Sequence, residues 1–206
     1  MRITARCQSV DPAARIGGDW YLTAVLPCGD VVLVVGDVVG HGLAAVATMM
    51  TLRFATAAYI AEDVSPGVVL SRLNTLLYGQ GTDLTASAVV ARYRPATGEL
   101  RWARAGHLPL LLATGTRVLV LPNPDGPLLG VAEDATFEHD SIWLRHGERI
   151  IGYTDGMVGR GSIDEGIHQL AERIQASLSV GDEIVNRLDY RTAADDACVL
   201  IAQRTG

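Results

Sequence analysis

The fold of this chain is decided by residues 31–42, which read Val31-Val32-Leu33-Val34-Val35-Gly36-Asp37-Val38-Val39-Gly40-His41-Gly42. The first five residues are all aliphatic, and such a run predicts a strand that is buried on both faces. The strand is expected to end at Gly36-Asp37, and after Gly42 the pattern becomes helical through about residue 61. A buried strand with an acidic residue at its end is therefore followed directly by an apolar helix.

The segments around this stretch predict the rest of the architecture. Further strands are expected over residues 2–8, 19–26, 85–93, 100–105, 108–113, 118–121, about 136–144, 148–154 and 197–202. Helices are expected over about 42–61, 66–78, 164–178 and 182–190. This order lacks the regular β-α-β alternation of a parallel sheet. We therefore expect an α+β fold, in which two antiparallel sheets pack face to face and helix pairs cover the outer faces, as one domain over residues 1–206.

The composition excludes several classes of protein. All 17 basic residues other than histidine are Arg, there is no Lys, and the formal net charge is −6. Chemistry that needs an ε-amine, such as a phosphate-loop lysine or a Schiff base, is therefore excluded. Because the chain has no basic run, we expect no nucleic-acid partner.

Cysteine usage and the apolar segment give expectations about the compartment. Cys7, Cys28 and Cys198 are widely spaced and form no Cys-x-x-Cys pair, so they predict neither a structural zinc site nor a disulfide framework. This usage fits a reducing cytoplasm, and the N-terminus lacks the apolar core of a signal peptide. The apolar stretch 42–61 contains Arg53 and three Thr, so we interpret it as a buried helix and expect no membrane partner.

Four aspartates lie where a predicted strand meets a turn: Asp19, Asp37, Asp155 and Asp195, the last beside Asp196. One such aspartate is ordinarily a turn or helix cap. Four of them along the chain indicate a shared site, and gathered carboxylates repel one another unless a cation lies between them. Oxygen ligands without His or Cys nearby point to Mg²⁺ or Mn²⁺ rather than zinc.

Other catalytic groups have weaker support. His41 and His107 lie beside glycine in turns, where a histidine is more often structural, and no histidine pair has the spacing of metal ligands. No serine lies in a Gly-x-Ser-x-Gly elbow, so a serine hydrolase has little support.

Taken together, the motifs resemble the metal-dependent protein phosphatases of the protein phosphatase 2C (PPM) superfamily, and most of all its SpoIIE/RsbU-like branch. The resemblance rests on Gly-Gly-Asp-Trp-Tyr at 17–21, Gly-Asp-Val-Val-Gly-His-Gly at 36–42, Leu73-Asn74, Leu-Thr-Ala at 84–86, Ala-Gly-His-Leu-Pro at 105–109, Pro-Leu-Leu-Gly at 127–130, Tyr-Thr-Asp-Gly at 153–156 and Asp195-Asp196.

This resemblance implies an α-β-β-α sandwich with a metal centre at one end. It implies two or more Mn²⁺ or Mg²⁺ ions, and a metal-activated water that hydrolyses phosphoserine or phosphothreonine in a protein. Carried over by position, the implied metal ligands are Asp19, Asp37, the Val38 carbonyl, Asp155 and Asp195, with Asp19 and Asp37 as the catalytic pair.

The resemblance also implies partners. In this branch the substrate is typically a phosphorylated STAS-type anti-sigma factor antagonist in a stress-response pathway. Relatives often carry an upstream sensor domain, and a partner or a second copy could contact the helices within 42–78. The first predicted strand starts almost at Met1, so the chain is either a stand-alone phosphatase or an excised domain.

Two positions depart from the family pattern. Leu22 and Gly159 stand where relatives usually or often have an acid, so we expect less negative charge near the site and weaker metal binding. The alternative interpretation is a catalytically weak or inactive regulatory module that binds a protein partner.

Overall fold

The computed structural model describes residues 1–9, 16–159, 161–178, 184–188 and 195–205. Its described strands form two antiparallel five-stranded sheets with the orders β1-β10-β9-β6-β7 and β2-β3-β4-β5-β8. The strands are β1 (Arg2–Gln8), β2 (Asp19–Val25), β3 (Val31–Val38), β4 (Ala86–Arg94), β5 (Glu99–Ala105), β6 (Leu111–Thr114), β7 (Arg117–Val120), β8 (His139–Trp143), β9 (Arg149–Tyr153) and β10 (Ala197–Gln203). The helices are α1 (Leu43–Ile60), α2 (Pro66–Tyr78), α3 (Ile163–Leu178), α4 (Ile184–Arg187) and the short 3₁₀ helix η1 (Asp155–Met157).

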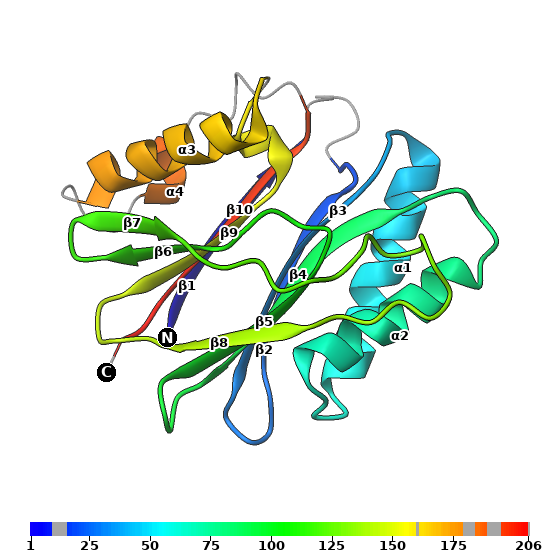
Figure 1. The fold of residues 1–206 in the computed structure, drawn as a ribbon, viewed down its shortest axis with the longest axis horizontal. Helices are drawn as coiled ribbons and strands as arrows, with labels where there is room; N and C mark the ends of the chain where they lie inside the picture. Colours follow the sequence, from blue (N-terminus) through cyan, green and yellow to red (C-terminus); the bar gives the residue numbers. More distant parts are fainter. Residues whose placement is uncertain (10–15, 160, 179–183, 189–194, 206) are drawn as a thin grey trace.

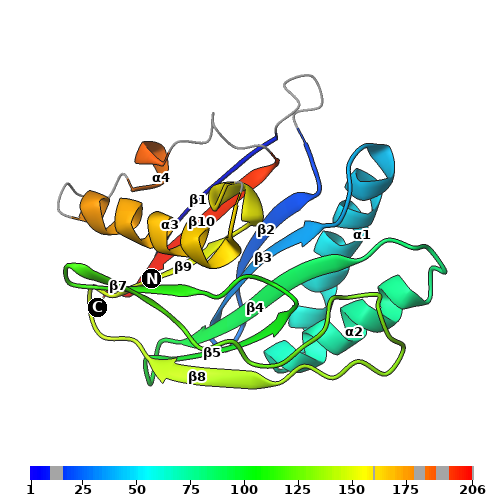
Figure 2. The same ribbon diagram turned by 45° about the horizontal axis from the view of Figure 1, so that its top comes forward.

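The elements stack in four layers, which confirms the predicted architecture. Figures 1 and 2 show α1 and α2 over the sheet that contains β3, and α3 and α4 over the sheet that contains β10. Apolar side chains fill the three spaces between these layers. Of the predicted helix over 182–190, the structure forms α4, while Leu188 lies in a bend and the remaining positions lie outside the described residues.

Strand β3 lies at the centre of the sandwich and serves two of these spaces. Val32 and Val34 face the helices α1 and α2, whereas Val31, Leu33 and Val35 face the other sheet. We expected the strand to end at Asp37. It continues to Val38, so Asp37 lies within the strand. The aliphatic run therefore buries both faces, as predicted, and carries Asp37 to the rim of the space between the sheets.

Helix α1 differs from the fully buried helix that we expected. One face packs on the sheet through Ala45, Thr48, Met49, Leu52, Thr56 and Ile60. The opposite face leaves Leu43, Met50 and Phe54 exposed. The helix is long and apolar enough to cross a membrane by length and composition, with 33% of its residues buried in the protein. Because the helix carries apolar residues on all its faces, their pattern in the sequence did not reveal which face is uncovered.

The cysteine prediction was wrong for one pair. Cys7 and Cys198 are joined by a disulfide, and they are direct register partners on the antiparallel strands β1 and β10. The two residues are 191 positions apart in sequence, and the spacing of the cysteines alone did not predict that their strands are neighbours. Cys28 has a free, exposed thiol.

Candidate metal centre

Asp19 and Asp37 form the base of the site because the register of β2 and β3 places them directly opposite each other. Their Cβ atoms are therefore about 5 Å apart, as for any directly opposed pair on antiparallel strands. Asp37 continues the row of Val31, Leu33 and Val35 on the face toward the other sheet. Two acidic groups on one face of a sheet are destabilising without a cation between them.

The other sheet supplies the remaining acidic residues. Asp155 begins η1 directly after β9, and Asp195 and Asp196 come directly before β10. Since β9 and β10 are neighbouring antiparallel strands, the end of one and the start of the other lie at the same rim. The charges of Asp155, Asp195 and Asp196 all act on the Asp37 carboxyl, so the acidic residues that adjoin the two sheets lie near the same rim.

Thr154 connects the two halves of this rim. Its hydroxyl donates to Asp19 Oδ2 at 2.6 Å and accepts from the Cys198 backbone N–H at 2.8 Å. The Thr154 backbone N–H in turn donates to the Cys198 carbonyl at 3.0 Å. One buried side chain thus connects an Asp19 oxygen, on the sheet that contains β3, to β10 of the other sheet.

Burial and mutual repulsion raise the pKa values of Asp19, Asp37 and Asp155 at the rim. Burial and then the Asp37 charge raise the pKa of Asp19 well above its ordinary value. Burial and then the Asp155 charge raise the pKa of Asp37 to about 7. Burial and then the Asp195 charge raise the pKa of Asp155 as well. A divalent cation at this rim would favour the charged forms and reverse these shifts.

Two glycines allow the rim to close. A Cβ at Gly17 would overlap Asp196 Oδ2, and one at Gly18 would lie 2.8 Å from the Val38 carbonyl oxygen. The Gly18 backbone N–H donates to Asp196 Oδ2 at 3.0 Å, and Ser9 Oγ donates to Asp196 Oδ1 at 2.9 Å. The predicted neighbour Asp196 is therefore an anchor that holds the Gly17-Gly18 turn against the rim.

The donor set fits a hard divalent cation. It consists of carboxylates with the Val38 carbonyl close by, and no ion pair neutralises Asp19, Asp37 or Asp155 among the described residues. In the same part of the chain, no three acidic, His or Cys side chains already stand in ligand geometry. The ligand set of Asp19, Asp37, Val38, Asp155 and Asp195 thus remains a prediction that the chemistry of the rim supports.

The two histidines lie in different surroundings. His107 is buried, its Nδ1 lies 2.7 Å from Ser87 Oγ, and Ser87 is the register partner of Asp37. Burial lowers the pKa of His107 to about 4, so its imidazole is neutral at physiological pH. This matches the structural role that we expected for His107, whereas His41 is exposed at the start of α1.

The structure changes the meaning of the two departures from the family pattern. Leu22 is buried with Trp20 in the cluster beneath α1, on the face of β2 that points away from the other sheet. Our expectation that Leu22 lowers the charge near the rim is therefore corrected, since an acid there would face the helices. Gly159 has φ +74°, a conformation that favours glycine over glutamate.

Solved structures show which class of protein has this fold. The RsbU and RsbW domains of Rv1364c from Mycobacterium tuberculosis match with a TM-score of 0.88 and 26% identity, over 99% of this chain and 60% of that chain. The PP2C phosphatase domain of SpoIIE from Bacillus subtilis matches with a TM-score of 0.78 and 15% identity, over 99% and 64%. RsbX in complex with magnesium matches with 0.71 and 16%, over 98% and 92%. The fold is that of the PP2C-type phosphatase domains.

Sequence comparison identifies the family within this class. The model of Stage II sporulation protein E (SpoIIE) matches residues 27–205, and the chain belongs to this family. The phosphoserine phosphatases RsbP and RsbU of Bacillus subtilis (strain 168) are similar relatives. RsbP is 23% identical over 82% of this chain and 44% of its own length, and RsbU is 24% identical over 71% and 44%. The chain therefore spans less than half the length of these curated relatives.

Removal of the Thr154 hydroxyl tests how the rim is held together. We expect Thr154→Val to weaken Mn²⁺ binding by about 10–100-fold, because Asp19 loses the donor that orients its carboxylate. Thr154→Ser is the matched control, since it keeps the hydroxyl and should stay within about threefold of wild type. Isothermal titration calorimetry with Mn²⁺ measures both affinities. Equal affinities for the Val and Ser variants would show that Thr154 does not orient Asp19.

The raised pKa of Asp37 predicts how stability depends on pH in the metal-free protein. An acid with a folded-state pKa of about 7 and an ordinary value of 3.8 binds more protons when folded, so the free energy of unfolding falls as pH rises through 7. We expect a loss of about 1 kcal/mol, or about 2–4 °C in Tm, between pH 6.5 and 8.5 in EDTA. The neutral His107 acts in the opposite direction, mainly below its ordinary pKa of 6.5 and only weakly above it, so the comparison starts there.

Thermal unfolding followed by circular dichroism measures this effect. Saturating Mn²⁺ should raise Tm more at pH 8.5 than at pH 6.5, because the ions stabilise the ionised carboxylates. A Tm in EDTA that is equal or higher at pH 8.5 than at pH 6.5 would contradict the claim that these carboxylates lie close together at the rim.

Proposed function

We propose that this chain is a protein-serine/threonine phosphatase that uses two or more Mn²⁺ or Mg²⁺ ions. The single observation that carries the proposal is the convergence of Asp19 and Asp37 on one sheet with Asp155 and Asp195 on the other. Membership in the SpoIIE family and the similarity to the phosphoserine phosphatases RsbP and RsbU support it. The match to RsbX, which was solved with magnesium, supports a divalent ion through the shared fold.

Each residue at the rim has a defined task in this proposal. Asp19, Asp37, Asp155 and Asp195 hold the ions together with the Val38 carbonyl. Bound divalent ions supply Lewis-acid activation of water and neutralise charge on the phosphoryl oxygens. Thr154 orients the Asp19 carboxylate, and the Gly17-Gly18 turn packs closely against Asp196 and the Val38 carbonyl.

The proposed substrate is a phosphorylated STAS-type anti-sigma factor antagonist. This follows from the SpoIIE/RsbU-like motifs, together with the similarity to RsbU and RsbP. An upstream sensor domain or a second copy that contacts α1 and α2 is a candidate regulator, because α1 begins only six residues after Asp37.

A turnover assay tests the proposal directly. We expect hydrolysis of p-nitrophenyl phosphate and of a phosphoserine peptide to rise with Mn²⁺ and to stop on addition of EDTA. The alternative, a weak or inactive module that binds a partner, predicts no turnover at saturating Mn²⁺. That result would overturn the proposed activity and leave the fold assignment intact.

A further inference from the structure

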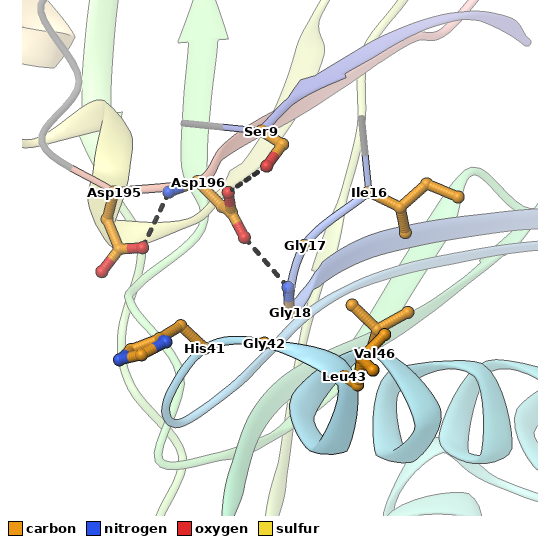
Figure 3. Close-up of a pocket in the computed structure, with 10 residues that line it drawn as sticks. All are labelled: Ser9, Ile16, Gly17, Gly18, His41, Gly42, Leu43, Val46, Asp195 and Asp196. Atoms are coloured by element: carbon orange, nitrogen blue, oxygen red, sulfur yellow. Dashed lines mark hydrogen bonds between the residues drawn. The ribbon is translucent and has the colours of Figure 1, made fainter. Parts of the chain in front are cut away.

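A cleft of about 570 Å³ opens beside the acidic rim, and its two ends differ in chemistry. Asp195 and Asp196 line one end, and the side chains of Ile16, Leu43 and Val46 line the other. Figure 3 shows the three aliphatic side chains gathered on one side of the Gly17-Gly18 backbone, with the two acids across from them. One continuous space therefore joins Asp195, one of the predicted metal ligands, to an apolar wall.

The apolar wall is exposed to solvent. Leu43, the first residue of α1, is 89% exposed, and Ile16 is 52% exposed. The apolar surface continues along the uncovered face of α1 through Met50 and Phe54. Exposed apolar side chains that gather at the mouth of a site mark a binding surface.

The two ends of the cleft select different parts of one ligand. A phosphate group can approach the acidic end only with cations bound there, because the carboxylates of Asp195 and Asp196 repel an anion. Among the residues that the structure describes, no charged side chain lines the aliphatic end. Burial of an apolar side chain is therefore the favourable interaction that these residues offer a ligand. Successive residues of a peptide are about 3.8 Å apart, so a side chain one or two residues from the phosphate can extend along the cleft toward this wall.

We infer that this cleft is a specificity subsite for a large aliphatic side chain, located one or two residues from the phosphorylated serine or threonine of a protein substrate. The inference rests on the proposed phosphatase function and adds a sequence preference to it. Leu43, Ile16 and Val46 form the subsite, and the acidic rim holds the phosphate end of the same segment through its cations.

Two synthetic phosphoserine peptides test the subsite. They are identical except that one has Leu, and the other Ser, at the two positions on each side of the phosphoserine. We expect kcat/KM with Mn²⁺ to be about tenfold higher for the Leu peptide, as expected when one apolar side chain is buried. In Leu43→Ser this ratio should fall to within about twofold of one. Leu119→Ser is the control, because Leu119 is an exposed leucine on β7, outside the lining of the cleft, and should keep the wild-type ratio.

Each outcome decides the inference separately from the proposed activity. A wild-type ratio near one, or a ratio that Leu43→Ser leaves unchanged, overturns the subsite even if the chain hydrolyses both peptides. If Leu43→Ser keeps the ratio but changes the mass measured by light scattering, the wall is a contact between copies, and the subsite is again overturned. If neither peptide nor p-nitrophenyl phosphate is hydrolysed, the proposed activity fails. The preference is then measured as the ratio of the peptide Kd values, by fluorescence anisotropy with Mn²⁺. A wild-type Kd ratio near one, or a ratio that Leu43→Ser leaves unchanged, again overturns the subsite.

Discussion

Asp37→Asn is expected to lower Mn²⁺-dependent hydrolysis of p-nitrophenyl phosphate by about a thousandfold or more. Asp37 lies opposite Asp19 in the register of β2 and β3, and it interacts with Asp155 and Asp195 from the other sheet. The amide keeps the shape of the side chain but removes the negative charge that a divalent ion needs. Steady-state kinetics with Mn²⁺ titrated to saturation measure the loss.

The same substitution should stabilise the metal-free protein. Burial and neighbouring charges raise the pKa of Asp37 to about 7, so its ionised form is costly in the fold. We expect Asp37→Asn to raise the free energy of unfolding in EDTA at pH 8 by about 2 kcal/mol. Urea denaturation measures this change.

Asp134→Asn is the control for both measurements, since Asp134 is exposed and lies away from the rim. It should leave turnover within about twofold of wild type and stability within about 0.5 kcal/mol. Full activity in Asp37→Asn, or a loss of activity together with a loss of stability in EDTA, would contradict the role of Asp37 as a metal ligand.

Gly156→Ala should have the second large effect, through the backbone of the rim. A Cβ at Gly156 would overlap the carbonyl oxygen of Asp196 and lie 2.8 Å from its carbonyl carbon. Because these atoms belong to backbone, the clash requires η1 and the start of β10 to separate. We expect a loss of about 3 kcal/mol in the free energy of unfolding, and turnover lowered by at least about a hundredfold as Asp155 moves.

Gly115→Ala provides a matched comparison. A Cβ at Gly115 meets no atom within 4 Å, but its φ of +58° is unfavourable for alanine. That variant should lose only about 1 kcal/mol and keep its turnover. Urea denaturation and the p-nitrophenyl phosphate assay compare the two variants. Equal losses of stability would show that backbone conformation, rather than contact with Asp196, sets the need for Gly156.

The sequence predicted the layers of this fold because local patterns were strong where they mattered. The aliphatic run of β3 indicated a strand buried on both faces, and the order of strands and helices excluded a parallel sheet. The exposed face of α1 was missed because that helix is apolar on every side. The disulfide between Cys7 and Cys198 depends on a pairing of the first and last strands that no local pattern specifies.

The candidate site was predictable in part for the same reason. The position of each aspartate close to the start or end of a strand can be read from the chain, and the family motifs gave their implied roles. The opposition of Asp19 and Asp37 required the register of β2 and β3. The Thr154 bridge to Asp19 required the stacking of the two sheets, although the Tyr-Thr-Asp-Gly motif already contained this residue.

Anomalous diffraction from crystals grown with Mn²⁺ tests the central claim most directly. The account predicts at least two strong anomalous peaks at the rim, each within about 2.5 Å of oxygens from Asp19, Asp37, the Val38 carbonyl, Asp155 or Asp195. It also predicts that these peaks disappear in Asp37→Asn crystals. Peaks located only elsewhere on the molecule, or no peak at the rim at saturating Mn²⁺, would contradict it.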